Sequence, residues 1–166
     1  LPWNFPFFLI ARKVAPSLIT GNAVVIKASE ETSNNAFFFS KLISDLDMPS
    51  GLINFVYGKG DTVGKHLSSH PDIDMISFTG SVETGSLIMQ EAGKNITKVN
   101  LELGGKAPAI VLGDAEIDKA VNKIKNARVI NSGQVCNCVE RVYVQNNILD
   151  EFTEKLKNTM EGVNFG

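Results

Sequence analysis

The sequence predicts an α/β fold built around a doubly wound sheet, and three observations lead to this. Continuous apolar runs alternate along the chain with segments whose apolar residues recur at helical spacing. The turns between them are short and rich in glycine. The chain has 166 residues, of which 43% are hydrophobic, enough for a substantial core. Alternation of this kind is typical of βαβ units that build a parallel sheet.

The expected elements of the first part of the chain follow in a regular order. Phe7 to Ala15 is expected to be a short helix that Pro16 closes. Strands are expected at residues 23–26, 53–57, 75–79 and 99–103, and the first of these is a continuous apolar run of the kind that is buried on both faces of a parallel sheet. Helices are expected between them, over 39–46, up to about 69, and over 81–92. Ser81 is a suitable N-cap for the last of these helices.

The pattern changes after the Gly104-Gly105 pair, where we expect a domain boundary. A short strand is expected at 109–111, followed by a helix that Asp114 caps. A polar turn then leads to Cys136, and a strand is expected over 141–145. Leu149, Phe152 and Leu156 mark the apolar stripe of a last helix.

Composition excludes several classes of protein. The net charge of −2 and the lack of a basic stripe argue against a nucleic-acid partner. No apolar run approaches the length of a membrane span. Two cysteines cannot form a disulfide framework, and no signal peptide is visible, so a reducing, cytoplasmic location is expected. Both ends resemble the interior of a longer chain, so we expect this sequence to be part of a larger protein.

Cys136 is the first candidate for chemistry. It follows Gly133-Gln134, a tight turn that can expose the sulfur, and a helix beginning there would lower the pKa of the thiol. The alternative is a buried structural cysteine. Cys138 could add a metal ligand, but structural metal sites need about four ligands, and the only histidines, His66 and His70, lie far away in the sequence. We therefore expect no metal, and a cysteine–histidine hydrolase fits poorly.

Glu102 is the second candidate, because it lies in the apolar segment Val99-Asn100-Leu101-Glu102-Leu103. A carboxylate buried in such a strand would have a raised pKa, which suits a general base. The alternative is a paired, structural carboxylate.

Three turns at expected strand ends could hold a dinucleotide. Lys27 and Glu30 could bind the hydroxyls of a ribose. The alternative is a solvated turn, which is what a Lys-x-x-Glu segment at the end of a strand usually forms. The turn Gly58-x-Gly60-x-x-x-Gly64 departs from the usual dinucleotide fingerprint. Gly80-Ser81 and the helix after it offer backbone N–H groups to a pyrophosphate.

Taken together and in this order, these segments resemble the aldehyde dehydrogenase superfamily over essentially the whole chain. The matching segments are 2–6 (PWNFP), 21–22 with 27–30 (GN, KASE), 49–51 (PSG), 78–81 (FTGS), 101–106 (LELGGK) and 132–136 (SGQVC). LELGGK and the later GQ-x-C are the most specific. Residues 130–144 are most similar to the bacterial lactaldehyde/glycolaldehyde dehydrogenase branch.

The resemblance implies an NAD-binding domain over residues 1–104 and the start of an α/β catalytic domain over 105–166. It implies that Cys136 is the nucleophile, that Asn4 is the oxyanion-hole amide, and that Glu102 is the base that releases the product. It places the following residues at the NAD cofactor: Trp3, Lys27, Glu30, Gly60, Gly80 and Ser81.

The implied activity is the NAD-dependent oxidation of a small hydroxyaldehyde, such as lactaldehyde or glycolaldehyde, to the acid through a thiohemiacetal and a thioester. The alternatives are a semialdehyde dehydrogenase of the same superfamily or a non-catalytic dinucleotide-binding relative. The resemblance further implies a homo-oligomer, a dimer or a tetramer, in the parent protein. Most substrate-pocket segments of the superfamily have no counterpart in this chain, so we expect the chain alone to be inactive.

Overall fold

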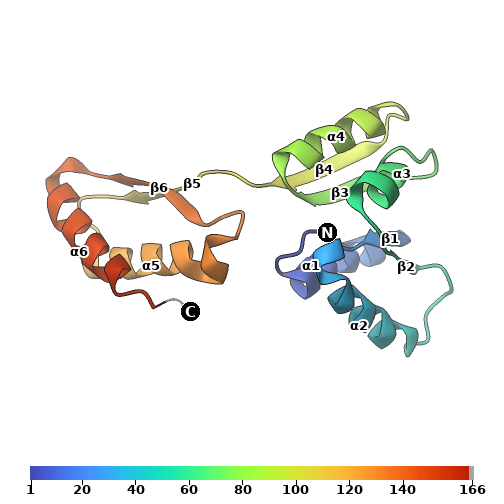
Figure 1. The fold of residues 1–166 in the computed structure, drawn as a ribbon, viewed down its shortest axis with the longest axis horizontal. Helices are drawn as coiled ribbons and strands as arrows, with labels where there is room; N and C mark the ends of the chain where they lie inside the picture. Colours follow the sequence, from blue (N-terminus) through green and yellow to red (C-terminus); the bar gives the residue numbers. More distant parts are fainter. Residues whose placement is uncertain (165–166) are drawn as a thin grey trace. The chain divides into compact units, whose positions relative to one another are not determined.

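The computed structural model describes residues 1–164, and its strands form three parallel pairs (Figure 1). The pairs are β1 (Val24–Lys27) with β2 (Ile53–Val56), β3 (Met75–Gly80) with β4 (Lys98–Leu103), and β5 (Ala107–Val111) with β6 (Val139–Val144). Each pair is joined through a helix, because parallel neighbours need a crossover connection. The predicted α/β class with parallel strands is therefore confirmed.

The helices are α1 (Pro6–Ile19), α2 (Ser33–Ser44), α3 (Lys65–Ser68), α4 (Val82–Gly93), α5 (Ile117–Val129) and α6 (Leu149–Glu161). Short helical turns lie between them: η1 (Glu30–Thr32), η2 (Gly60–Gly64), η3 (Ile130–Gly133) and η4 (Asn146–Ile148). The chain divides between Leu103 and Gly104 into two units. The first unit contains β1 to β4 and the second contains β5 and β6.

Helices α1 and α2 pack on the β1–β2 pair through one hydrophobic core, whose buried members include Ile10, Val14, Ile26 and Ala36. Leu18 also packs against this core, although it lies beyond the proline at which the helix was expected to end. That expectation is wrong, because Leu18 continues the stripe of Ile10 and Val14 by one more turn. Burial of this stripe offsets the hydrogen bond that a proline inside a helix removes.

Helix α4 begins as the sequence predicts. Ser81 is its N-cap, and the Ser81 hydroxyl accepts a hydrogen bond from the backbone N–H of Thr84 at 3.1 Å. One turn later, Gly85 is buried against β4, where an added Cβ would lie 2.8 Å from a methyl carbon of Leu103. Gly85 thus allows the helix to approach the strand closely.

In the second unit, α5 and α6 pack on the same face of the β5–β6 pair. Their shared core contains Val111, Val121, Ile124 and Phe152. The expectation that Asp114 caps α5 is wrong: the helix begins three residues later, at Ile117, with no side-chain cap. Ala115 and Ile117 both pack against this core.

The pairing of β5 with β6 contains a β-bulge. Ala107 pairs with Val139, but the next residue, Pro108, pairs with Arg141, so Glu140 is the extra residue. Proline has no N–H to donate to a sheet, which accounts for an irregularity at this point. The bulge breaks the alternation of side chains along β6, and such irregularities re-aim a side chain.

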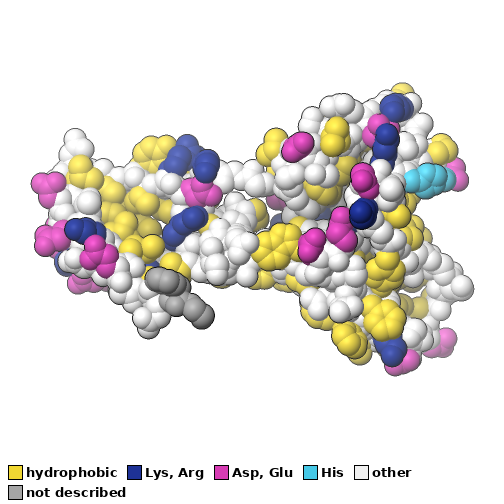
Figure 2. Space-filling model, viewed as in Figure 1, with side chains coloured by type: hydrophobic (Ala, Val, Ile, Leu, Met, Phe, Trp, Pro, Cys, Tyr) yellow, Lys and Arg dark blue, Asp and Glu magenta, His cyan; other side chains and the backbone are white. Residues whose placement is uncertain are grey.

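Large apolar side chains reach the surface of both units (Figure 2). On the β5–β6 pair, the exposed side chains include Ile110, 72% exposed, and Tyr143, 53% exposed. Apolar area of this kind is typical of a surface that packs against other protein. Among the helices of residues 1–164, none combines the length and the apolar character needed to span a membrane.

Candidate functional site

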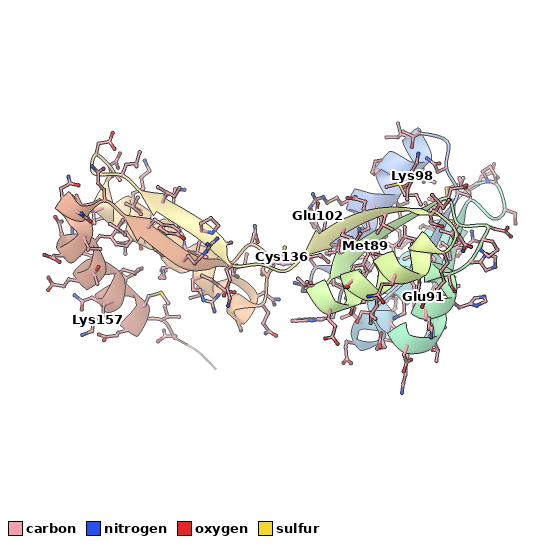
Figure 3. The ribbon with its side chains drawn as sticks, turned by 90° about the horizontal axis from the view of Figure 1, so that it is seen from above. Met89, Glu91, Lys98, Glu102, Cys136 and Lys157 are labelled. Atoms are coloured by element: carbon pink, nitrogen blue, oxygen red, sulfur yellow. The ribbon has the colours of Figure 1, made fainter. Side chains whose placement is uncertain are left out.

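Cys136 lies in the loop between α5 and β6, and its side chain is exposed (Figure 3). The loop begins with η3 and ends where β6 starts at Val139. The expectation that the turn leads into a helix N-terminus is therefore wrong. The sequence from Val139 to Val144 is rich in β-branched residues, which favour a strand.

The backbone just before Cys136 is strained. Asn131 and Ser132 have φ values of 49° and 55°, and Gly133 follows with 78°. Left-handed conformations are unfavourable for residues with a side chain, and they cluster where a function needs a fixed geometry. Two hydrogen bonds close the turn: the Gln134 N–H donates to the Asn131 carbonyl at 3.1 Å, and the Asn131 amide donates to the Gln134 carbonyl at 3.3 Å.

Cys138 anchors the other side of the same loop. Its side chain is buried, 1% exposed, and its thiol lies 3.9 Å from the carbonyl oxygen of Ile130. Its backbone N–H donates to the carbonyl of Val135 at 3.0 Å. The two cysteines therefore differ in environment: Cys136 faces solvent and Cys138 faces the core.

Potential metal ligands do not gather in threes or more anywhere in residues 1–164. The rings of His66 and His70 lie 5.4 Å apart, centroid to centroid. However, Nδ1 of His70 accepts a hydrogen bond from the backbone N–H of Asp72 at 3.2 Å, so this nitrogen already has a partner.

Glu102 lies on β4, and the expectation that its carboxylate is buried is wrong, because the residue is exposed. Val99, Leu101 and Leu103 turn to the more buried face of the strand. Glu102 and Asn100 take the opposite face, as the two-residue period of a strand requires. The segment is alternating rather than uniformly apolar.

Lys13 of α1 is a neighbour of Glu102 that the sequence analysis missed. Its ammonium group donates a hydrogen bond to the Ser77 hydroxyl at 2.7 Å, on the strand that pairs with β4. Burial lowers the pKa of Lys13, the Glu102 carboxylate raises it in part, and Arg12 lowers it. The signal in the sequence was a lysine next to the apolar stripe of α1, three residues after the buried Ile10.

Three of the residues expected at the cofactor come together after β1 and β2. The Lys27 ammonium donates to the Glu30 carboxylate at 2.8 Å. This bond, together with the backbone N–H groups of Glu30 itself and of Gly60, lowers the pKa of Glu30 from 4.5 to about 2. Two neighbouring hydroxyl groups can donate hydrogen bonds to the ionised carboxylate of Glu30 and accept one from the ammonium group of Lys27.

The pH dependence of this pair gives a first prediction. The folded pKa of Glu30 is depressed, so its contribution to stability is complete above about pH 4.5 and is lost as pH falls towards 2. We expect Glu30→Gln to lower the free energy of unfolding at pH 6 by less than about 1 kcal/mol, as for an exposed pair, and to leave it unchanged near pH 2. Urea unfolding at the two pH values measures this. An equal loss at both would show that the ion pair does not contribute.

Gly80 and Ser81 lie where β3 ends and α4 begins. A Cβ at Gly80 would overlap the ring of Phe78, so a side chain at this position would require the ring to move. The N-terminal N–H groups of α4, a helix of 12 residues, are suited to an anionic group.

Trp3 and Asn4 lie just before Phe5, the N-cap residue of α1. Trp3 is 42% exposed and Asn4 is partly buried. Phe5, the N-cap residue of α1, has a left-handed backbone with φ 52°. A strained residue thus follows Asn4 directly, as strained residues precede Cys136.

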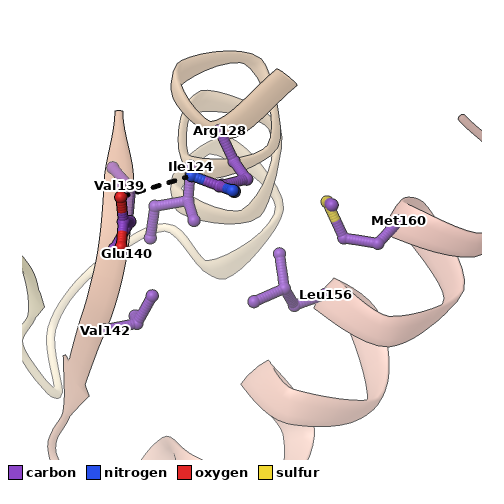
Figure 4. A pocket seen from close by; sticks show the side chains of 7 residues that line it. All are labelled: Ile124, Arg128, Val139, Glu140, Val142, Leu156 and Met160. Carbon is purple, nitrogen blue, oxygen red and sulfur yellow. Dashed lines mark ion pairs between the residues drawn. The ribbon is translucent and has the colours of Figure 1, made fainter. Parts of the chain in front are cut away.

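A hollow of about 300 Å³ lies in the second unit between α5, β6 and α6 (Figure 4). Its lining consists of Ile124, Arg128, Val139, Glu140, Val142, Leu156 and Met160. None of the residues expected at the site lines it, so it does not mark the chemistry. It does show that Arg128 and Glu140 face each other across it, with an Nη1–Oε1 distance of 4.0 Å.

The sequence profile of the Aldehyde dehydrogenase family matches residues 1–166. This chain belongs to the aldehyde dehydrogenase family.

Individual relatives agree with this assignment. Lactaldehyde dehydrogenase of Escherichia coli K12 is 59% identical over 166 residues, which is 100% of this chain and 35% of the relative. Aldehyde dehydrogenase [NAD(P)+] 2 of Saccharomyces cerevisiae is 44% identical over 160 residues, 96% of this chain and 32% of that protein. The chain thus spans about a third of the length of these aldehyde dehydrogenases.

Solved structures of aldehyde dehydrogenases have the same fold. A crystal structure of the E. coli lactaldehyde dehydrogenase gives a TM-score of 0.96 at 59% identity, covering 99% of this chain and 35% of that one. Betaine aldehyde dehydrogenase of Staphylococcus aureus, in complex with NAD+, gives 0.94 at 39% identity over 99% of this chain and 33% of that one.

Proposed function

We propose that the full-length aldehyde dehydrogenase containing this chain oxidises a small hydroxyaldehyde, of the lactaldehyde or glycolaldehyde kind, to its carboxylic acid with NAD⁺. The 59% identity to E. coli lactaldehyde dehydrogenase over every residue of the chain carries this proposal. The exposed Cys136 on a strained loop supports the covalent route. Oxidation of lactaldehyde by the purified full-length protein, followed as NADH absorbance, tests it; no NADH with any small hydroxyaldehyde would overturn it.

In the proposed reaction the Cys136 thiolate attacks the aldehyde carbon, and the carbonyl oxygen becomes an oxyanion. The side-chain amide of Asn4 donates a hydrogen bond to this oxygen. When bound, NAD⁺ supplies the hydride acceptor, and loss of the hydride leaves an acyl group on the sulfur of Cys136. The strained loop contributes by fixing the direction from which the thiolate attacks.

Glu102 acts in the second half of the proposed reaction. Its carboxylate takes a proton from water, the resulting hydroxide adds to the thioester carbon, and the carbon–sulfur bond breaks to release the acid and the thiolate. Glu102 is exposed on its strand, which gives water access to its carboxylate. Lys13 is a neighbouring group, and the Glu102 carboxylate raises its pKa in part.

The residues of the first unit fit NAD⁺. The Lys27 ammonium and the Glu30 carboxylate would bind the hydroxyls of the adenosine ribose, with Gly60 holding Glu30 in place. The N-terminus of α4 at Ser81 would hold the pyrophosphate. Trp3 and Gly80 would lie beside the cofactor.

We also propose that the full-length protein is a homo-oligomer.

The carboxylate of Glu30 leads to a prediction on cofactor preference. A 2′-phosphate would lie against this carboxylate, so we expect kcat/KM with NAD⁺ to exceed that with NADP⁺ by about tenfold or more, since 1.4 kcal/mol of repulsion gives a factor of ten. Glu30→Gln should narrow the ratio, and the neighbouring exposed Glu31→Gln should leave it unchanged. Steady-state kinetics with both cofactors decide this. A preference for NADP⁺ in the unaltered protein would contradict the assignment of Glu30 to the ribose.

A further inference from the structure

The loop that carries Cys136 starts after Arg128 and ends before Glu140. Arg128 is the penultimate residue of α5, and Glu140 is the bulged residue of β6. Their side chains approach to 4.0 Å between Nη1 and Oε1 (Figure 4). This ion pair therefore joins the two ends of the loop.

Arg128 also supports the strained part of the loop directly. A Cβ added to Gly133 would lie 3.2 Å from Nη2 and 3.3 Å from Cζ of Arg128. The guanidinium group thus covers Gly133, the last of the three left-handed residues before the nucleophile. Such conformations persist only where the surroundings determine them, and the guanidinium is one of those surroundings.

The bulge explains why Glu140 reaches Arg128. Val139 and Val142 both line the hollow beneath α5, although they are three residues apart, because the extra residue shifts the alternation. Glu140 lines the same hollow, where its side chain is 28% exposed. Bulges in parallel pairs are rare, and bulges are frequent beside active sites.

A third group fixes Glu140. Its carboxylate also forms an ion pair with Lys106, and this bond, with a smaller contribution from the charge of Arg128, lowers the pKa of Glu140. The backbone of Lys106 is held in turn, because Arg141 donates a hydrogen bond to its carbonyl at 2.8 Å. Glu140 is therefore an ionised, oriented partner for Arg128.

We propose that Arg128 and Glu140 are positioning residues for Cys136: their ion pair closes the base of the loop and seats the guanidinium on Gly133, which fixes the direction of the thiol. The proposal rests on the function proposed above, in which Cys136 is the nucleophile. Neither residue has a role of its own in the reaction steps proposed above. Their effect reaches the reaction through the backbone of residues 131–136.

The test uses the full-length protein with Arg128→Met, Glu140→Gln and the double variant. The matched control is Lys119→Met, which breaks an exposed ion pair with Glu116 on the same helix. Two rates are measured: kcat for aldehyde oxidation, and the rate constant for alkylation of Cys136 by iodoacetamide, resolved from Cys138 by fragment mass spectrometry. The Kd for NAD⁺ and the thermal midpoint are recorded for each protein.

We expect each single variant to lower kcat and to change the alkylation rate about three- to tenfold, with the Kd for NAD⁺ unchanged. The double variant should be no worse than the worse single one, because the two residues act as a pair. Wild-type alkylation and kcat in folded Arg128→Met and Glu140→Gln proteins would overturn the proposal. If Arg128→Met does not fold, Glu140→Gln decides alone. Aldehyde oxidation that survives Cys136→Ala would instead overturn the proposed function. The alkylation rates of the other variants would still show whether Arg128 and Glu140 position the Cys136 thiol.

Discussion

Replacing Cys136 by alanine is expected to abolish aldehyde oxidation by the full-length enzyme while leaving cofactor binding intact. The substitution removes the sulfur that would form the thiohemiacetal, so kcat should fall by about 10⁴-fold or more, as for other enzymes that lose their nucleophile. Stopped-flow NADH absorbance measures the loss. Titration of NAD⁺ by calorimetry should give an unchanged Kd, because Cys136 is not among the residues proposed to bind the cofactor.

Cys138→Ala is the matched control for this experiment. Cys138 faces the core and is expected to contribute to stability rather than to chemistry. The variant should therefore melt at a lower temperature but retain a kcat within a few-fold of the original when assayed well below its melting point. Turnover that persists in Cys136→Ala and disappears in Cys138→Ala would show that Cys138 is the nucleophile and that Cys136 is not.

Glu102→Gln is expected to separate the two halves of the reaction. The amide keeps the size of the side chain but cannot take a proton from water, so hydride transfer should proceed once and hydrolysis of the thioester should stall. Rapid mixing should give a burst of about one NADH per site, followed by a steady state about 10²- to 10⁴-fold slower than that of the original enzyme. Intact mass after the burst should show the acyl group on the protein.

Loss of the burst itself would contradict this assignment, because Glu102 would then act before hydride transfer, for example on the thiol. Asn100→Asp is a useful companion variant. Asn100 shares the exposed face of β4 with Glu102, so the substitution adds a second carboxylate to that face and leaves Glu102 unchanged. It should keep both the burst and most of the steady-state rate.

The sequence predicted the strands and most of the helices because each has a distinct apolar pattern. It predicted the Ser81 cap because an N-cap depends on neighbours three residues away at most. It also placed Lys27 and Glu30 at the same turn. These are features in which residues close in the sequence decide the structure.

The features that were missed depend on contacts between distant segments. The end of α1 was misplaced because Leu18 packs against a core to which β1 and α2 also contribute. Lys13 was overlooked as a neighbour of Glu102, since the two lie on different elements, and the pairing of Arg128 with Glu140 requires the bulge opposite Pro108. The sequence shows the apolar stripe of α1 and the lysine beside it, but it does not show which distant residues they contact.

Gly85 shows how such distant contacts can mislead a mutational scan. It touches no proposed ligand, yet its missing side chain lets α4 lie directly on Leu103. Alanine is accommodated only if the end of the Leu103 side chain turns away, whereas a branched residue displaces the helix together with its first turn at Ser81. A Gly85→Val protein would then be scored as defective in dinucleotide affinity. The defect would belong to the spacing between a helix and a strand, and a residue that never meets the cofactor would be misassigned to its binding site.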